Sequence, residues 1–540
     1  MKVEYVPVEY ANPLVNMYLS DFSKVGHLFD YDPGNNDSFR ERQKAIMNDY
    51  HTDRRALVRI LSEYNKGLHC GEKTLDNLKR LQDPETTVVI TGQQAGILTG
   101  PLYTIYKTLS VIQLAHRAAL ETGRDVAPVF WVAAEDHDYA EIDHIDMVDR
   151  EQNLVRLKLG YNPPGKMSVG DIPVTEEVFR LIEELEALTN PSEWKKDILG
   201  KVAGMAREAD SLASWFARVM SWLFREQGLV LIDPMNRELR RLWSGTFQAF
   251  LDQSGEANER LRAGVERVRA LGAEPQVEKD EDNVNMFLYV GGERMPLLKA
   301  GDSYRVRGRD DTWSIEELKT LAAERPEQLS PNVVLRPVAQ DVLLPIMAYV
   351  AGPGEISYYA LYRDIYHLFG QRMPVIFPRA NVTLVEGSVA KNMYRYGVEF
   401  SLGKEGLRER LNENLDAQDR LGIETLFDDY TKEIRNTFNK LVDKAAGVDP
   451  ELTGHGSESL NRILHQVEHF RKKVNQYHRK ANDTMIKRFR RMEDQLFPRD
   501  NWQERVFNIF PYLFKYGPDI VDRLAELPLL ENNDHKLIFL

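Results

Sequence analysis

The sequence is poor in cysteine and has no long apolar run. Cys70 is the one cysteine among 540 residues, which excludes an intramolecular disulfide and a cysteine-rich metal site. The longest apolar stretch, around 342–351, is interrupted by Pro345 and is too short to span a bilayer. The first twenty residues also lack the continuous apolar segment of a signal peptide. We therefore expect a soluble, cytoplasmic protein with no membrane partner.

The chain also lacks a basic excess. It carries 83 acidic and 70 basic side chains, for a formal charge of −13. This balance argues weakly against sequence-independent binding of nucleic acid, although it allows a local basic patch. The basic segments 471–480 and 486–491 are explained more simply as solvated helical faces. We expect no nucleic-acid partner.

Five short apolar segments predict a parallel sheet. They lie at 88–91, 128–133, 228–234, 344–351 and 373–378, with helical patterns between them, among them one helix over 355–370. A strand, a helix and a second strand within fifty residues are typical of a parallel βαβ unit. The fold class is therefore α/β, with a Rossmann-like, doubly wound parallel sheet as its core, over residues 1–390.

Two long intervals interrupt this scheme. Residues 145–210 and 255–335 contain alternating and loop-like segments, and the second interval resembles a small antiparallel meander. We interpret both as connecting insertions within the core domain rather than as independent domains.

Residues 391–500 predict a helical arm. A first helix is expected from about 415 to 444, then a loop at 447–459, then a second helix with a heptad seam. The seam continues at 485 after an extra step of four, a stutter that locally unwinds a supercoil. An antiparallel coiled coil about 30 residues and ~45 Å long would expose this seam for homodimerisation; two ordinary packed helices are the alternative. Residues 501–540 are expected to pack back on the core. The seam consists of Ile463, Val467, Phe470, Val474, Tyr477 and Ala481, continued by Met485, Phe489, Met492 and Leu496.

The first candidate site is the glycine-rich turn after the first strand. Its sequence, GQQAGILTGPLY, matches neither a P-loop nor a dinucleotide-binding fingerprint. We expect its backbone N–H groups and the following helix N-terminus to face a crevice and favour an anion. The alternative is that the glycines only allow tight packing. The candidate binding residues here are Gln93, Gln94, Gly96, Thr99, Gly100, Tyr103 and Lys107.

The second candidate site follows the second strand, where open α/β sheets place their ligands. Glu135, His137 and Asp138 are the candidate catalytic residues. A histidine between carboxylates suits a base with a raised pKa or a metal ligand. A helix N-cap and a solvated acidic loop are the alternatives. We assign no metal site.

The third candidate site surrounds the fourth and fifth strands. Gly352 and Gly354 allow close backbone approach, and Glu355 opens a helix, a position that acidic residues also favour for structural reasons alone. Arg336 lies in the preceding loop, and Arg379 ends the fifth strand. Either arginine could pair with a carboxylate or a phosphate.

Three long motifs carry a resemblance to a known family. TGQQAGILTGPLYTIYKT, PVFWVAAEDHD and LRPVAQDVLLPIMAYVAGPGEISYYA, together with the C-terminal coiled-coil region, resemble the bacillithiol biosynthesis family of cysteine-adding enzymes over essentially the whole chain. The resemblance implies a Rossmann-like core with two insertions and a dimeric coiled coil. It also implies a carbon–nitrogen ligase that joins cysteine to the amine of glucosaminyl-malate.

The activating cosubstrate stays open. The core is also similar to class I aminoacyl-tRNA synthetases, but the position of their HxGH signature reads LTGPLY, and no KMSKS-like loop follows the fifth strand. ATP, another activating nucleotide or a pre-activated donor would each serve. Our hypothesis is that the glycine turn and Arg336 hold anionic groups while the 135–138 segment orients or deprotonates the amine. A non-catalytic scaffold that senses a small anion and acts through its coiled coil is the alternative.

Overall fold

The computed structural model describes residues 1–278 and 280–540. The chain divides into two compact units. The core unit comprises residues 3–383 and 503–538, and the arm unit comprises 1–2, 384–502 and 539–540. The last forty residues thus belong largely to the core unit.

A five-stranded parallel sheet forms the centre of the core unit. In spatial order it is β13 (Val375–Pro378), β12 (Ile346–Ala351), β2 (Thr87–Gln93), β3 (Val126–Val132) and β6 (Val230–Ile232). All four neighbouring pairs are parallel. All five predicted strands are confirmed, and their order is that of a Rossmann-like sheet. The order reverses between β2 and β12, which makes this pair the topological switch point.

Helices cover both faces of the sheet, and this is why its strands are apolar throughout. Val88 and Ile90 pack into one buried cluster with residues of α3 (Arg54–Gly67). Val89 points the other way, into a cluster formed by α5 (Leu102–Thr122) and α2 (Asp37–Asp49). Because successive strand residues alternate between faces, one three-residue run serves both layers.

The first insertion is more helical than its sequence indicates. It begins with the antiparallel hairpin β4 (His144–Val148) and β5 (Leu154–Lys158) and continues with α6 (Glu176–Leu188) and α7 (Lys195–Arg207). The next helix, α8 (Leu212–Leu223), returns the chain to the core.

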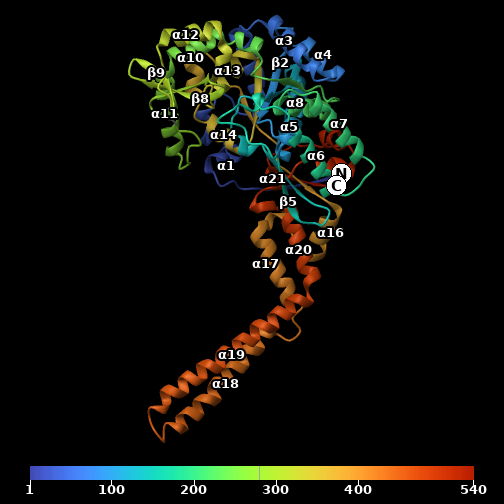
Figure 1. Ribbon diagram of the computed structural model, residues 1–540, viewed down its shortest axis with the longest axis vertical. Coiled ribbons are helices and arrows are strands. Elements are labelled where there is room, and N and C mark those ends of the chain that lie inside the picture. Colours follow the sequence, from blue (N-terminus) through green and yellow to red (C-terminus); the bar gives the residue numbers. More distant parts are fainter. Residues whose placement is uncertain (279) are drawn as a thin grey trace. The chain divides into compact units, whose positions relative to one another are not determined.

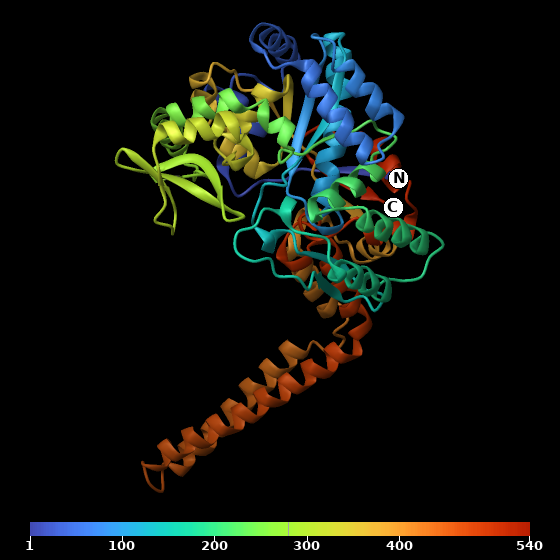
Figure 2. The ribbon, with the colours of Figure 1, turned by 45° about the horizontal axis from the view of Figure 1, so that its top comes forward.

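The second insertion contains the predicted meander. Its antiparallel sheet has the order β10-β9-β8-β7-β11 and is drawn in yellow-green in Figure 2. The strands are β7 (Asn283–Val290), β8 (Glu293–Ala300), β9 (Ser303–Val306), β10 (Thr312–Trp313) and β11 (Leu329–Pro331), flanked by α11 (Ser254–Ala270) and α12 (Ile315–Glu324).

The prediction of a single helix over 355–370 is wrong. The structure has α14 (Pro353–Tyr359) and α15 (Arg363–Leu368), joined by a turn. The N–H groups of Leu361 and Tyr362 donate three residues back instead of four. Helix α11 packs against this turn so closely that a Cβ on Gly264 would lie 2.5 Å from the carbonyl oxygen of Leu361. Tertiary packing therefore overrides the helical propensity of the segment.

The remaining elements are short. The other helices of the core unit are α1 (Pro13–Ser20), α4 (Glu72–Arg80), α9 (Arg237–Arg241), α10 (Ser244–Asp252), α13 (Arg336–Leu343), α21 (Gln503–Val506), α22 (Phe510–Tyr516) and α23 (Ile520–Ala525). The boundary between the two units passes through β1 (Lys2–Val6), β14 (Val382–Val385) and β15 (His535–Phe539).

The arm unit contains the predicted antiparallel helix pair. Helices α18 (Ile423–Ala445) and α19 (Leu452–Ala481) run side by side in Figures 1 and 2. Arg471 of α19 joins them through ion pairs with Asp428, at 2.7 Å, and Glu424, at 3.1 Å. The unit also contains α16 (Gly387–Tyr396), α17 (Gly403–Asp416) and α20 (Asp483–Leu496).

Three details of the arm differ from the sequence-based expectation. The first helix starts at Ile423 rather than near 415, because Gly422 takes a left-handed conformation with φ of 60°. The loop between the helices covers only 446–451. At the expected stutter the helix breaks at Asn482 instead of unwinding gradually. Among the described residues, no helix is both long and apolar enough to cross a membrane.

Candidate functional site

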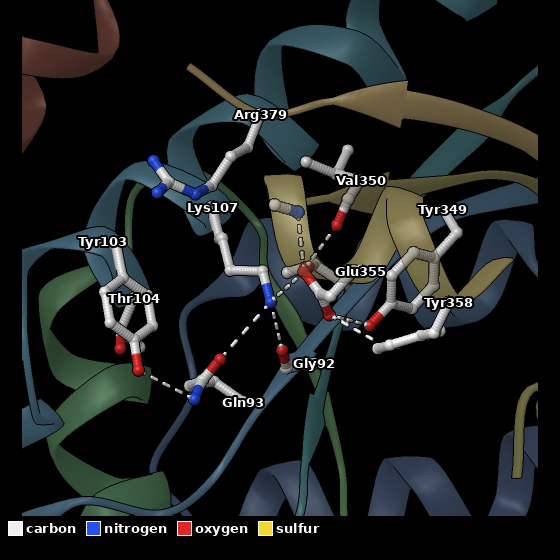
Figure 3. A network of polar contacts seen from close by, with 12 residues as sticks. Gly92, Gln93, Tyr103, Thr104, Lys107, Tyr349, Val350, Glu355, Tyr358 and Arg379 are labelled. Atoms are coloured by element: carbon white, nitrogen blue, oxygen red, sulfur yellow. Dashed lines mark hydrogen bonds and ion pairs between the residues drawn. The ribbon is translucent and has the colours of Figure 1, made fainter. Parts of the chain in front are cut away.

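The switch point brings together side chains from distant parts of the sequence. β2 ends in Gly92 and Gln93, and β12 leads through Gly352 to Glu355 on α14. Open α/β sheets bind ligands at the carboxyl ends of their strands, where the strand order reverses. Figure 3 shows Lys107 and Glu355 pointing toward each other at this place.

Lys107 is a buried cation with three acceptors. Its Nζ lies 2.7 Å from Oε2 of Glu355, 2.8 Å from the carbonyl oxygen of Gly92 and 3.3 Å from Oε1 of Gln93. Its side chain is 3% exposed. Burial lowers the pKa of Lys107, and the charge of Glu355 offsets part of that effect. Because an ammonium has three N–H groups, Lys107 has no donor left for a ligand.

Glu355 is equally committed to the protein. Oε2 also accepts the N–H of Gly352 at 2.7 Å, and Oε1 accepts the hydroxyls of Tyr349 and Tyr358 at 2.7 and 3.3 Å. Burial raises the pKa of Glu355, but Lys107 and the Gly352 hydrogen bond outweigh it, so the pKa lies below its usual value. The pair therefore ties β2, α5 and α14 together as a fixed frame.

The two arginines of the third candidate site differ in their surroundings. Arg379 donates to Glu504 at 2.5 Å and to the carbonyl oxygen of Ala380 at 2.8 Å, and both ionic side chains are buried. Arg336 has one long contact, 3.4 Å from Nη2 to the hydroxyl of Tyr358, and its Nε has no hydrogen-bond partner in the described part of the chain. Glu355 acts on both Arg336 and Lys107, so one carboxylate compensates the two positive charges at the switch point only in part.

Two adjacent glutamines connect the end of β2 to its surroundings, Gln93 to α5 and Gln94 to the loop after β3. Nε2 of Gln93 donates to the hydroxyl of Tyr103 at 3.0 Å, and Nε2 of Gln94 donates to Oδ2 of Asp136 at 2.8 Å. Burial raises the pKa of Tyr103 to about 12, so this phenol stays protonated at neutral pH. The candidate residues after β2 and β3 therefore belong to one connected edge of the sheet.

The acidic residues after β3 have separate structural tasks. Glu135 pairs with Arg240, and both side chains are buried. Oδ1 of Asp136 accepts the N–H groups of His137 and Asp138 at 2.7 and 3.1 Å, which fixes the turn. The side chain of Asp138, in the same turn, is exposed to solvent. In the described part of the chain, no group of three or more His, Cys, Asp or Glu side chains could hold a metal ion.

His137 lies in the same loop, and its side chain is partly buried. Its Nδ1 is buried and has no partner among the described residues, and its ring packs edge-on against Phe287. Burial lowers the pKa of His137, and Arg294 lowers it further, while Asp136 acts in the opposite direction. The expected raised pKa is therefore wrong. A neutral imidazole suits proton acceptance at neutral pH, and because Nδ1 is buried, Nε2 is the nitrogen left for that role.

The glycine-rich turn has a strained backbone instead of the expected open loop of free N–H groups. Leu98, Thr99 and Gly100 have successive positive φ angles of 50°, 73° and 67°. Such angles are costly for non-glycine residues, above all for a β-branched one. Nδ2 of Asn508 donates to the carbonyl oxygens of Leu98 and Gly100, each at 2.7 Å, and holds the turn in place.

The expected free N–H groups of this turn are largely used within the protein. The N–H groups of Gly96, Ile97, Gly100 and Leu102 donate to carbonyl oxygens of Gln94, Ile142, Ile97 and Phe507, respectively. The side chain of Thr99 is fully buried. A Cβ on Gly96 would lie 2.9 Å from the Cα of Gly100, so close packing explains this glycine. Gly354, in contrast, has open space around it.

Replacing Asn508 with alanine should destabilise the core unit. Two buried carbonyls lose their donor, and each costs about 1–3 kcal/mol. Thr99→Gly should recover part of this loss in the double variant, because glycine adopts positive φ freely. Urea denaturation measures both effects, and exposed Asn412→Ala is the matched control, expected within about 0.5 kcal/mol of wild type. An Asn508→Ala variant as stable as Asn412→Ala would show that Asn508 does not hold the turn in place.

Several residues of the site have no signal in the local sequence. Tyr358 could have been found, since it lies three residues after Glu355 on a predicted helix. Arg240, Glu504 and Asn508 could not, because each meets its partner from a segment more than 100 residues away.

Fold and site together define the class of the protein. It is a Rossmann-like α/β protein with a polar site at the switch point of its sheet and a C-terminal coiled-coil domain. The family model for the N-terminal Rossmann-like domain of bacillithiol biosynthesis BshC matches residues 1–380, and that for its C-terminal coiled-coil domain matches residues 382–540. The chain belongs to the bacillithiol biosynthesis BshC family.

Relatives resemble the chain over their full length. A protein of Desulforamulus reducens is 38% identical over 100% of both chains, and one of Symbiobacterium thermophilum is 39% identical over 100% of both. One of Bacillus cereus is 32% identical over 96% of this chain and 97% of its own. All three carry the name "Putative cysteine ligase BshC".

Proposed function

We propose that this protein is a cytoplasmic cysteine ligase of bacillithiol biosynthesis, which joins the carboxyl group of cysteine to the amine of glucosaminyl-malate in an amide bond. The family and the names of the relatives support the pathway and the ligase class. The structural observation that carries the proposal is the sheet edge itself. His137, which is neutral at neutral pH, follows β3, and Arg336 opens the helix before β12; β3 and β12 are the two neighbours of β2 in the sheet.

The proposal gives these residues different roles. Arg336 holds an anionic group of substrate or nucleotide, because its guanidinium is charged at any physiological pH and Glu355, the carboxylate that acts on it, is already paired with Lys107. His137 accepts the proton that the amine loses as it attacks the activated carboxyl carbon. Exposed Asp138 attracts and orients that amine.

The remaining candidates form the frame of the site. Glu135 positions the loop through Arg240 instead of touching substrate. Lys107, Glu355 and Arg379 hold the sheet edge through their ion pairs. Gln93 and Tyr103 join β2 to α5, and Gln94 joins the end of β2 to the loop after β3. Gly352 caps α14, while open Gly354 leaves room for a ligand.

Amide formation in water needs an activated carboxyl group. We propose ATP or another nucleotide as the activating cosubstrate, which would convert the cysteine carboxylate into an acyl donor. The nitrogen of the amine then bonds to the carbonyl carbon, the bond to the leaving group breaks with its electron pair, and the surplus proton passes to His137.

We further propose that the arm makes a homodimer. Several large apolar side chains of α18 and α19 are exposed in the single chain, and burying them against a second copy would be favourable. They are Tyr430, Leu441, Phe470 and Tyr477, exposed to 57, 59, 61 and 69%.

The decisive experiment combines purified protein with cysteine, glucosaminyl-malate and each nucleoside triphosphate in turn, and detects bacillithiol by mass spectrometry. We expect product with one of the nucleotides and none from the His137→Ala/Asp138→Ala variant. A Phe470→Glu/Tyr477→Glu variant tests the dimer and should sediment as a monomer.

The same two variants test the scaffold alternative in cells. If His137→Ala/Asp138→Ala keeps full thiol production while Phe470→Glu/Tyr477→Glu loses it, the protein is a scaffold rather than the ligase.

A further inference from the structure

Residues 165–170 of the first insertion form a strap beside the loop after β3. The N–H group of Val169 donates to the carbonyl oxygen of Asp136 at 2.7 Å, and the N–H group of Gly170 donates to that of Ala134 at 2.8 Å. These bonds fix the backbone of the strap to the residues directly before the candidate base. A side chain at the start of the strap therefore lies in the neighbourhood of that base.

The other side of the strap is fixed to the second insertion. The N–H group of Arg294 on β8 donates to the carbonyl oxygen of Lys166 at 3.0 Å, and the N–H group of Lys166 donates to Oε1 of Glu293 at 3.1 Å. The hydroxyl of Ser168, which is fully buried, lies 3.0 Å from that of Tyr289 on β7. The two insertions therefore meet at this segment, next to the loop after β3.

Glycines at both ends of the strap restrict its path. Gly165 has a φ of 61°, and a Cβ at this position would overlap Oε1 of Glu293. A Cβ on Gly170 would overlap the sulfur of Met235. Because a larger residue fits at neither end without a shift of its neighbours, the backbone between them is held in one position.

The side chain of Lys166 is exposed at the start of the strap. Its ammonium makes no hydrogen bond or ion pair with any residue that the structure describes. The carboxylate of Glu293 lies near it but is paired with Arg309 at 3.1 Å. Because an ammonium has three N–H groups, Lys166 keeps three donors for a ligand.

A second set of contacts connects Lys166 to His137. Arg294, which bonds the backbone of Lys166, has its Cζ 3.9 Å from the centroid of the Phe287 ring, and that ring meets the ring of His137 at 5.7 Å. After burial and Arg294, the charge of Lys166 is a further cause that lowers the pKa of His137. Arg294 is buried within the second insertion, whereas Lys166 is exposed. Lys166 is therefore the cation near His137 that a ligand can reach.

We infer that Lys166 is a second anion-binding residue of this site and holds the phosphate-bearing leaving group of the activated cysteine beside His137. When the amine nitrogen bonds to the carbonyl carbon, the bond from that carbon to the leaving oxygen breaks, and its electron pair stays on this oxygen. The ammonium stabilises the negative charge that develops there. Arg336 lies before β12, on the other side of β2, so the two cations hold different anionic groups. This inference rests on the proposed function for the identity of the leaving group.

Sulfate tests this anion site without turnover, because its charge stays constant across a histidine titration. The Cε1–H signal of His137, assigned with His137→Gln in full-length protein labelled at histidine, reports the pKa of the ring by NMR. Sulfate should raise this pKa in wild type and in Lys166→Arg, relative to chloride of equal ionic strength, since a nearby anion favours the imidazolium. It should have no such effect in Lys166→Ala. Lys299→Ala, an exposed position on β8, is the matched control and should respond like wild type.

Turnover tests the role of Lys166 in the reaction. Lys166→Ala should lower kcat about 10²–10³-fold, the usual cost of removing one donor to a developing negative charge. The KM for glucosaminyl-malate should stay unchanged, because the leaving group belongs to the other substrate. Lys166→Arg should recover most of kcat, since it restores the positive charge. Thermal melts should show equal stability for Lys166→Ala and Lys299→Ala, because both lysines are exposed.

The outcomes keep the two proposals apart. A pKa of His137 that responds to sulfate equally in wild type and Lys166→Ala, or in neither, overturns the anion site, as does an unchanged kcat in Lys166→Ala. A sulfate response that depends on Lys166, in a protein that forms no bacillithiol with any nucleotide, would support the anion site and overturn the ligase.

Discussion

Lys107→Met should lower the free energy of unfolding by about 3–5 kcal/mol, the usual cost of removing one partner of a buried ion pair. The reason is the carboxylate left behind. Glu355 keeps its charge next to Tyr349 and Tyr358 but loses its cation, while Gly92 and Gln93 lose a donor. Urea denaturation monitored by tryptophan fluorescence measures the change.

A double-mutant cycle separates the charge from the shape. Lys107→Met/Glu355→Gln should be more stable than the sum of the single variants predicts, because the uncompensated charge is gone. Lys201→Met, which breaks an exposed pair with Asp197, is the matched control and should cost at most about 1 kcal/mol. Equal costs for the two lysine variants would show that the Lys107 pair does not hold the frame.

The same pair gives the stability a defined pH dependence. The folded pKa of Glu355 lies below its ordinary value of 4.5. Its contribution is therefore fully present above that value and is lost as the pH falls through the lowered, folded pKa. Lys107→Met removes the first of the lowering causes while the burial that raises the pKa remains, so the variant should lose less of its stability than wild type does as the pH falls below 4.5.

The sequence predicts the frame of this site better than its details. The sequence predicts that Gln93, Lys107 and Glu355 lie close together, because the carboxyl ends of adjacent parallel strands meet at one edge of a sheet. The strands concerned, β2 and β12, are both recognisable by their apolar runs. The pattern also predicts that both faces of the sheet are covered, since Val88, Val89 and Ile90 are all apolar.

What the sequence does not reveal depends on long-range partners. Glu135 and Arg379 look available in the sequence, yet Arg240 and Glu504 neutralise them. Leu98 and Thr99 give no local sign of positive φ, which Asn508 imposes from 410 residues away. The direction predicted for the pKa shift of His137 is wrong for the same reason. Two flanking carboxylates are visible in the sequence, but the burial and Arg294 that outweigh them are not.

His137→Ala should reduce the rate of bacillithiol formation by about 10²–10⁴-fold at neutral pH, the usual contribution of a general base. Its fold should persist, because the ring is partly exposed and Nδ1 has no partner among the described residues to leave orphaned. His137→Gln should be equally slow, since an amide keeps the polarity of the ring but accepts no proton at this pH. Initial rates with saturating substrates and thermal melts measure the two effects separately.

The pH profile carries the sharper form of this prediction. Only neutral His137 accepts a proton, so the rate should be flat above its pKa and fall tenfold per pH unit below it, with the bend under 6.5 because burial and Arg294 lower the pKa. Asp138 raises this pKa and Lys166 lowers it. Asp138→Asn should therefore move the bend to lower pH, and Lys166→Ala should move it to higher pH. A bend that stays fixed in both variants would assign the proton transfer to another group, since both charges lie close to this ring and act on it with opposite signs.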